Sequence, residues 1–175
     1  MSSPTPALIP ADLGPLLQST VIALRAELDA LPDRVLSWRP RPGEWCVKEV
    51  VGHLIEAERR GFAGRIRIIL DADAPALEGW DPDEVARARH DDAGEARALV
   101  GELAALREDS VRLVAGLGPA ELSRRGIHPK VGPLTVADLL HEWVFHDRNH
   151  VRQILENVRD WAWPHMGNAQ RFTTG

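Results

Sequence analysis

Four stretches of this chain repeat apolar residues at the spacing of an α-helix, and they constrain its fold more than any other feature. The first stretch has one face made of Leu13, Leu17, Thr20, Leu24, Leu28 and Leu31, which recur at steps of three and four. That spacing predicts one long amphipathic helix, and Pro32 ends it. Three more helices are expected at about 46–70, 94–115 and 135–158.

Start and stop signals support these boundaries. The second helix should begin near Cys46, because "CVKE" has the form of a capping box with Glu49 in the third helical position. Thr135 should cap the fourth helix, with Asp138 in the equivalent position. The third helix is expected to end at "GLGP", where glycine and proline stop it.

The connections between these helices indicate the fold class. Residues 71–93 contain two prolines, a glycine and several aspartates, so a long crossover is expected there, with a helical turn at "DPDEVARAR". A link of this length can cross a bundle, which would let the second and third helices run parallel. The segment "ELSRRGIHPKVGP" is expected to be irregular, and no alternating β-pattern is visible. We therefore predict an all-α four-helix bundle.

Size and charge limit the remaining possibilities. With 175 residues, the chain is expected to form one domain (1–175), with a core at about 10–158 and a tail at 159–175. Lysines and arginines are scattered and the net charge is -5, which argues against nucleic acid as a partner. No apolar stretch approaches the roughly 18 residues of a membrane span. The single cysteine and an N-terminus without the pattern of a secretory signal predict a cytoplasmic protein.

Histidines are concentrated in the segment "LLHEWVFHDRNH" of the fourth predicted helix. His146 and His150 are four residues apart, so their side chains lie about 40° apart around the helix, as in a metal-chelating pair. His141 lies five residues before His146, about 140° away, and cannot share an ion with it. The zinc-protease pattern H-E-x-x-H is also absent, because the spacing here is H-E-x-x-x-H. The alternative for the pair is a solvated helix face.

A third histidine, His53, lies among apolar residues in "VVGHLIEAE" of the second predicted helix. It is either a core residue or a ligand that faces the fourth helix, since metal sites of bundles are built between facing helices. Three imidazoles from two helices would leave coordination positions open, as catalytic metal sites do.

Polar residues near these histidines are the candidates for catalytic roles. Glu142 and Gln153 lie on the same face as His146, and Glu56 lies one turn after His53. They are candidate proton carriers or orienters of the ligands. His128, Trp80, Trp161 and Trp163 are candidates for lining a ligand cavity. Cys46 is either a buried small residue or a reactive thiol at a helix N-terminus.

Two segments, "RPRPGEWCVKEVVGHLIEAE" and "GPLTVADLLHEWVFHDRNHVRQI", resemble the DinB/YfiT-like superfamily of bacterial four-helix-bundle metalloproteins. The resemblance covers roughly residues 10 to 158. It implies an up-down-down-up bundle and a divalent ion (zinc, nickel or iron) held by His53, His146 and His150. It also implies a homodimer, which the apolar surplus of the first and fourth helices favours too.

The resemblance says less about the reaction. Characterised members include S-transferases and isomerases that use a low-molecular-weight thiol, so the chain is predicted to be a metal-dependent thiol S-transferase or hydrolase acting on a small molecule. The residues themselves do not separate thiolate transfer from hydrolysis. The alternative is a non-enzymatic, stress-related metal-binding bundle, since no catalytic carboxylate stands at a fixed motif spacing.

Overall fold

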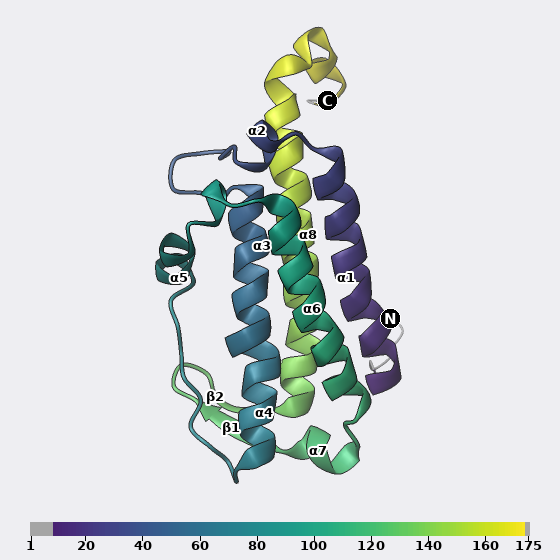
Figure 1. Cartoon of the computed structure of the whole chain (residues 1–175), viewed down its shortest axis with the longest axis vertical. Coiled ribbons are helices and arrows are strands. Elements are labelled where there is room, and N and C mark those ends of the chain that lie inside the picture. The colour runs from purple at the N-terminus through teal and green to yellow at the C-terminus, as the bar shows by residue number, and fades with distance from the viewer. Residues whose placement is uncertain (1–8, 174–175) are drawn as a thin grey trace, which may run out of the picture.

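Four long helical segments form the bundle in a computed structural model that describes residues 9–173. They are α1 (Pro10–Ala30); α3 (Val47–Glu56) with its continuation; α6 (Ala96–Ala115); and α8 (Val136–Ala162) (Figure 1). The predicted all-α four-helix bundle is confirmed. The prediction that the N-terminus lacks a secretory signal concerns residues that lie mostly outside the described range. Within that range, no helix is long and apolar enough to cross a membrane.

Two of the helices run in one direction and two in the other, and the two helices of each direction lie side by side. In Figure 1, α1 and α8 run upward, whereas α3 and α6 run downward. Helix α1 packs against α6 and α8, and α3 packs against the same two helices. The link between α4 and α6 therefore returns along the outside of α3, at the left of Figure 1. This return places crossover residues beside the middle of α3.

The core follows the predicted helix faces. Of the six residues in the stripe on α1, five are buried and Leu31 is half-buried. On α6, Leu99, Leu103 and Ser110 are buried. Full burial of a leucine side chain contributes about 1.5–3 kcal/mol, so these stripes account for much of the packing between α1 and α6.

The second helical segment departs from the expected regular helix. After α3, residues Ala57–Phe62 form a π-helix, η1, and α4 (Ala63–Asp71) continues from it. A π-turn accommodates an extra residue, which shifts the face that the following side chains present. The fourth helix also runs past the predicted end near Val158 and stops at Ala162. Pro164 comes just after it, and a proline has no N–H to continue the hydrogen bonds of an α-helix.

The prediction of an irregular connection at 121–133 was wrong. Residues Arg125–His128 (β1) and Gly132–Thr135 (β2) form an antiparallel hairpin. Two short helices, α2 (Asp33–Leu36) and α7 (Pro119–Ser123), were also not expected. Each of these elements has only four or five residues, too few to establish a periodic pattern.

The hairpin holds the start of the crossover. The Leu77 N–H donates to the Ile127 carbonyl at 2.8 Å, and the Ile127 N–H donates to the Pro75 carbonyl at 2.8 Å. Gly126 lies so close to this segment that a Cβ atom there would be 2.8 Å from Leu77 Cγ. The crossover is therefore fixed against the lower end of the bundle by main-chain pairing.

The rest of the crossover packs directly on α3. It contains α5 (Pro82–Arg89), which is the helical turn expected from the sequence and is capped by Asp81, and the short 3-10 helix η2 (Asp91–Ala93). A Cβ on Gly52 would lie 1.7 Å from Asp91 Oδ2. Only glycine at position 52 allows this approach, which brings the crossover against the turn of α3 that carries His53. The tail forms the 3-10 helices η3 (Trp163–His165) and η4 (Gly167–Phe172) and extends beyond the end of the bundle (Figure 1).

Candidate metal centre

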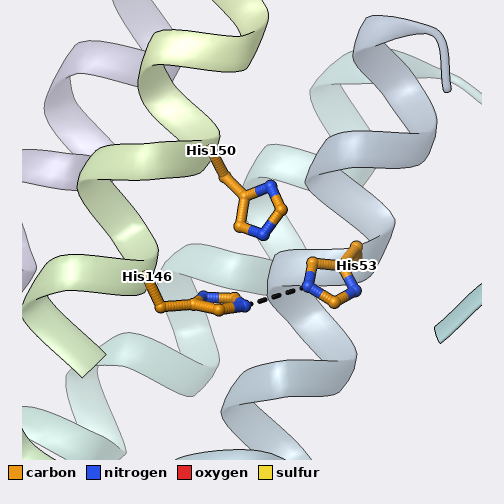
Figure 2. A group of neighbouring side chains, drawn as sticks. All are labelled: His53, His146 and His150. Atoms are coloured by element: carbon orange, nitrogen blue, oxygen red, sulfur yellow. Dashed lines mark hydrogen bonds between the residues drawn. The ribbon is translucent and has the colours of Figure 1, made fainter. Parts of the chain in front are cut away.

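Three histidine rings converge between α3 and α8. Figure 2 shows His53 on α3 pointing toward His146 and His150, which lie on consecutive turns of α8. The Nε2 atoms of His53 and His146 are 3.0 Å apart, and one ring nitrogen of each histidine lies within 4.8 Å of the others. The structure thus brings together the three residues that the spacing and the resemblance had selected.

Hydrogen bonding fixes which nitrogen of His150 faces the cluster. Its Nδ1 is 2.8 Å from Oε1 of Gln153. Because a carbonyl oxygen only accepts, this Nδ1 carries the proton and the lone pair is on Nε2. The Nδ1 atoms of His53 and His146 are buried and have no partner among the described side and main chains. Their ring positions are therefore set by packing and by the contact between their Nε2 atoms.

Burial keeps the rings neutral. Loss of solvent, together with the neighbouring histidines, lowers the pKa of His53 to about 3. Burial and His150 lower the pKa of His146 to about 4, and burial lowers the pKa of His150 as well. Neutral imidazole is the form that binds metal ions. The site is thus ready for a cation at neutral pH without first losing protons.

The donor set fits a divalent ion. Two imidazole nitrogens bound tetrahedrally to zinc at about 2.0–2.1 Å are about 3.3 Å apart, close to the 3.0 Å between His53 and His146. Between residues 9 and 173, the group contains no fourth histidine, cysteine, aspartate or glutamate. Three protein ligands leave a coordination position open, as in catalytic zinc sites.

Aromatic rings surround the cluster. The Trp45 ring lies 4.9 Å from His53 and 6.4 Å from His150. Trp80 stacks on His53 at 5.6 Å, and Phe62 meets His146 edge-on at 5.1 Å. Trp45 and Phe62 were not predicted to lie near the histidines, and the closeness of Trp45 to "KEVVGH" is the one signal in the sequence for it. These rings exclude water and fix the imidazole planes.

A cavity of about 450 Å³ opens beside the cluster. It is lined by His53 and His146, and by Glu142 on α8. Trp80 and His128 also line it, as the sequence analysis considered. Trp161 and Trp163 do not, and the Trp161 ring instead lies 5.9 Å from that of His165 in the tail.

The candidate carboxylates have different environments. Glu142 is exposed and lines the cavity. Glu56 is buried and its carboxylate accepts hydrogen bonds from Arg60 at 2.6 Å and Arg89 at 2.8 Å. The carboxylate of Glu56 is thus bound by arginines, and Glu56 does not line the cavity. Of the two, only Glu142 has access to a molecule in the cavity.

Two other residues lie apart from the cluster. His141 is exposed, and its Nδ1 donates to the Ala137 carbonyl at 2.7 Å. Cys46 is buried at the start of α3, and burial raises the pKa of its thiol to about 11. A thiol that stays protonated is a poor nucleophile, so the structure favours the buried small residue over the reactive thiol.

A second buried polar cluster, which was not predicted from the sequence, adjoins the histidines. Arg107 of α6 is fully buried, and its guanidinium lies 2.6 Å from Asp147 and 2.9 Å from Glu58. Asp147 directly follows His146, and Glu58 is in the π-helix. The Arg107 side chain also lies over the Trp143 ring. This charge cluster ties α6, η1 and α8 together behind the histidines.

Comparisons with known proteins agree with this architecture. The sequence model of the DinB superfamily matches residues 17–154. A protein of Oceanobacillus iheyensis named "Putative metal-dependent hydrolase" is 25% identical over 152 residues, covering 86% of this chain and 83% of that protein. One of the same name from Geobacillus thermodenitrificans is 30% identical over 150 residues, with 81% and 79% covered. The structure of YfiT from Bacillus subtilis, a four-helix bundle of unusual topology, superposes with a TM-score of 0.81 at 20% identity, covering 93% of this chain and 94% of that one.

Proposed function

The chain belongs to the DinB superfamily, and from this premise we propose that it is a metal-dependent enzyme acting on a small molecule, with His53, His146 and His150 holding a divalent ion. One observation carries the proposal: three neutral imidazoles converge on one point, without a fourth ligand from the described residues, next to a cavity of about 450 Å³. A metal with a purely structural role would instead be enclosed by four protein ligands.

Residues around the site have distinct roles in this proposal. A bound divalent ion would supply a Lewis acid that lowers the pKa of a water or thiol. Glu142 lines the cavity and is placed to accept the proton from that group. Gln153 holds His150 in the tautomer that offers Nε2. Trp45 and Trp80 limit the access of bulk water to the rings.

The reaction is proposed to be hydrolysis or thiol S-transfer. The names of two relatives favour hydrolysis, whereas transfer from a low-molecular-weight thiol rests on the family resemblance. Both need an activated nucleophile and a proton acceptor, so Glu142→Gln should impair either. Ester hydrolysis by the zinc-, nickel- or iron-loaded protein, measured with and without a small thiol, separates the two. Bound metal without either activity would favour the non-enzymatic alternative.

Metal content tests the ligand set. His146→Ala and His150→Ala should each remove the ion from purified protein, because two imidazoles cannot hold it tightly. His141→Ala is the matched control on the same helix and should keep the wild-type metal content by atomic emission. A folded His141→Ala protein without metal, or a folded His146→Ala protein with full metal, would contradict the proposed site.

We further propose a cytoplasmic homodimer that pairs through α1 and α8. These helices expose three large apolar side chains, Ile22, Phe145 and Leu155, each at least half accessible. Exposed apolar groups of this size favour association. Light scattering at micromolar concentration should give twice the mass of the chain, and a monomer would contradict this part of the proposal.

A further inference from the structure

Arg65 of α4 lines the same cavity as the histidines, and its guanidinium is only partly satisfied. Its Nη2 donates to the Glu78 carbonyl at 3.0 Å and lies 3.1 Å from His128 Nε2. Its Nε is buried without a hydrogen-bond partner within the described part of the chain. Its hydrogen-bond partners are thus a main-chain carbonyl and a histidine ring, and neither is a carboxylate.

Two other arginines that are drawn into the protein form ion pairs with carboxylates. Arg89 binds the carboxylates of Glu56 and Asp91, and Arg107 binds those of Glu58 and Asp147. Among residues 9–173, no carboxylate oxygen lies within 4.0 Å of the Arg65 guanidinium, and Glu142 acts on it only at longer range. Burial accordingly lowers the pKa of Arg65. Arg65 is thus a positive charge at a cavity wall that lacks its counter-ion.

This charge and the histidines line one cavity. His53 and His146 line one part of it, and Phe62 and Trp80 lie beside them. Arg65, His128 and Lys130 line the remainder, with Glu142 as its acidic residue. A molecule in this space would meet histidine rings, aromatic rings and cationic groups on the walls of one cavity.

We propose that Arg65 binds a carboxylate group of the substrate, so that the enzyme acts on small organic acids whose reacting group lies at the histidines and whose carboxylate lies at Arg65. This inference rests on the proposed function of the site. The planar guanidinium matches a carboxylate and forms stronger, charge-assisted hydrogen bonds with it. Lys130 lines the same cavity and adds positive charge there.

A pair of probe molecules tests the role of Arg65. The zinc-loaded protein is titrated by calorimetry with 3-phenylpropionate and with its neutral amide, 3-phenylpropionamide. Wild type should bind the acid about 10-fold more tightly, the low end of the range for a charged hydrogen bond. Arg65→Gln should reduce this preference below about 3-fold. Arg67→Gln is the matched control, because Arg67 is exposed on the same helix and does not line the cavity.

Two further measurements keep the test decisive. Arg65→Lys retains the positive charge but lacks the planar pair of N–H donors of the guanidinium. It should therefore show an intermediate preference for the acid, and it provides a test even if Arg65→Gln does not fold. Repeating the titration after zinc removal separates Arg65 from direct binding of the acid to the ion. The acid preference should persist without zinc. The inference would be overturned if Arg65→Gln kept the preference for the acid. It would also be overturned if wild type lost that preference when only the zinc was removed.

The zinc content of wild type separates this inference from the proposed function. Protein that binds zinc but shows no preference for the acid would contradict the role of Arg65 and leave the metal site standing. Protein that binds no zinc but shows an Arg65-dependent preference would contradict the metal site and leave the carboxylate-binding group standing.

Discussion

Two buried polar clusters lie side by side in the bundle, joined by the consecutive residues His146 and Asp147, and they are stabilised in opposite ways. In the charge cluster, Arg107 is held by Asp147 at 2.6 Å and by Glu58 at 2.9 Å. In the histidine cluster, the rings have no carboxylate partners in the described structure and burial lowers their pKa values, so they stay neutral. The first cluster is closed by its own charges, and the second retains free lone pairs.

This difference shows how a buried ligand site can be recognised. Burial of a charge is tolerated when an opposite charge compensates it. Neutral rings avoid the cost of charge burial and keep their acceptor atoms available. Arg65 extends the same reasoning to a cation, because it lacks the ion pairs that Arg89 and Arg107 have.

Removal of Arg107 should have the largest effect on stability. Arg107→Met leaves Glu58 and Asp147 buried without a counter-ion, and the loss of one partner of a buried pair costs about 3–5 kcal/mol. Urea unfolding followed by circular dichroism measures this change. A triple variant, Arg107→Met with Glu58→Met and Asp147→Leu, removes every charge and should recover most of the loss. A cost below about 1 kcal/mol for Arg107→Met alone would mean that the cluster is not held by its charges.

Removal of the Gln153 side-chain oxygen should have the next largest effect, on metal affinity. Gln153→Leu frees the His150 ring to take either tautomer, and loss of such an orienting group typically lowers metal affinity 10–100-fold. Competition with a chromophoric zinc chelator measures the affinity. Arg152→Leu, at the neighbouring exposed position on α8, is the control. Equal affinities for the two variants would show that packing alone orients His150.

Acid should destabilise the metal-free protein, with the smallest of the three effects when each ring is counted separately. Free histidine titrates near pH 6.5, whereas the pKa is about 3 for His53 and about 4 for His146 in the folded state. Between pH 6.5 and 5.5 the unfolded chain therefore binds protons that the folded chain does not. The free energy of unfolding should fall with pH, by at most about 1.4 kcal/mol per pH unit for each ring.

The same experiment on two variants assigns the acid effect. His146→Gln should have a shallower pH dependence, because one buried ring is gone. His141→Ala removes an exposed ring and should keep the wild-type slope. Identical slopes for wild type and His146→Gln would show that the rings are already protonated in the folded protein and would remove the contrast between the two clusters.

Local patterns in the sequence were sufficient to predict several features of the structure. The leucine stripe of α1 is a property of helical spacing, and its burial followed the prediction. The angle between His146 and His150 follows from helix geometry, as does the separation of His141 from them. These features depend only on residues within a few turns of one another, so no knowledge of the rest of the chain was needed.

Other features were decided by the tertiary structure. Glu56 and Glu142 were equivalent candidates in the sequence, yet one is bound by Arg60 and Arg89 and the other lines the cavity. Arg107 and Arg65 are both arginines on helices, and only their distant neighbours give one two carboxylate partners and the other none within 4.0 Å among the described residues. Periodicity identifies the side of a helix that is buried, whereas the identity of its neighbours depends on contacts between residues far apart in the chain. The crossover that places Trp80 on His53, for example, depends on the hairpin contact at Ile127 and the close approach of Asp91 to Gly52.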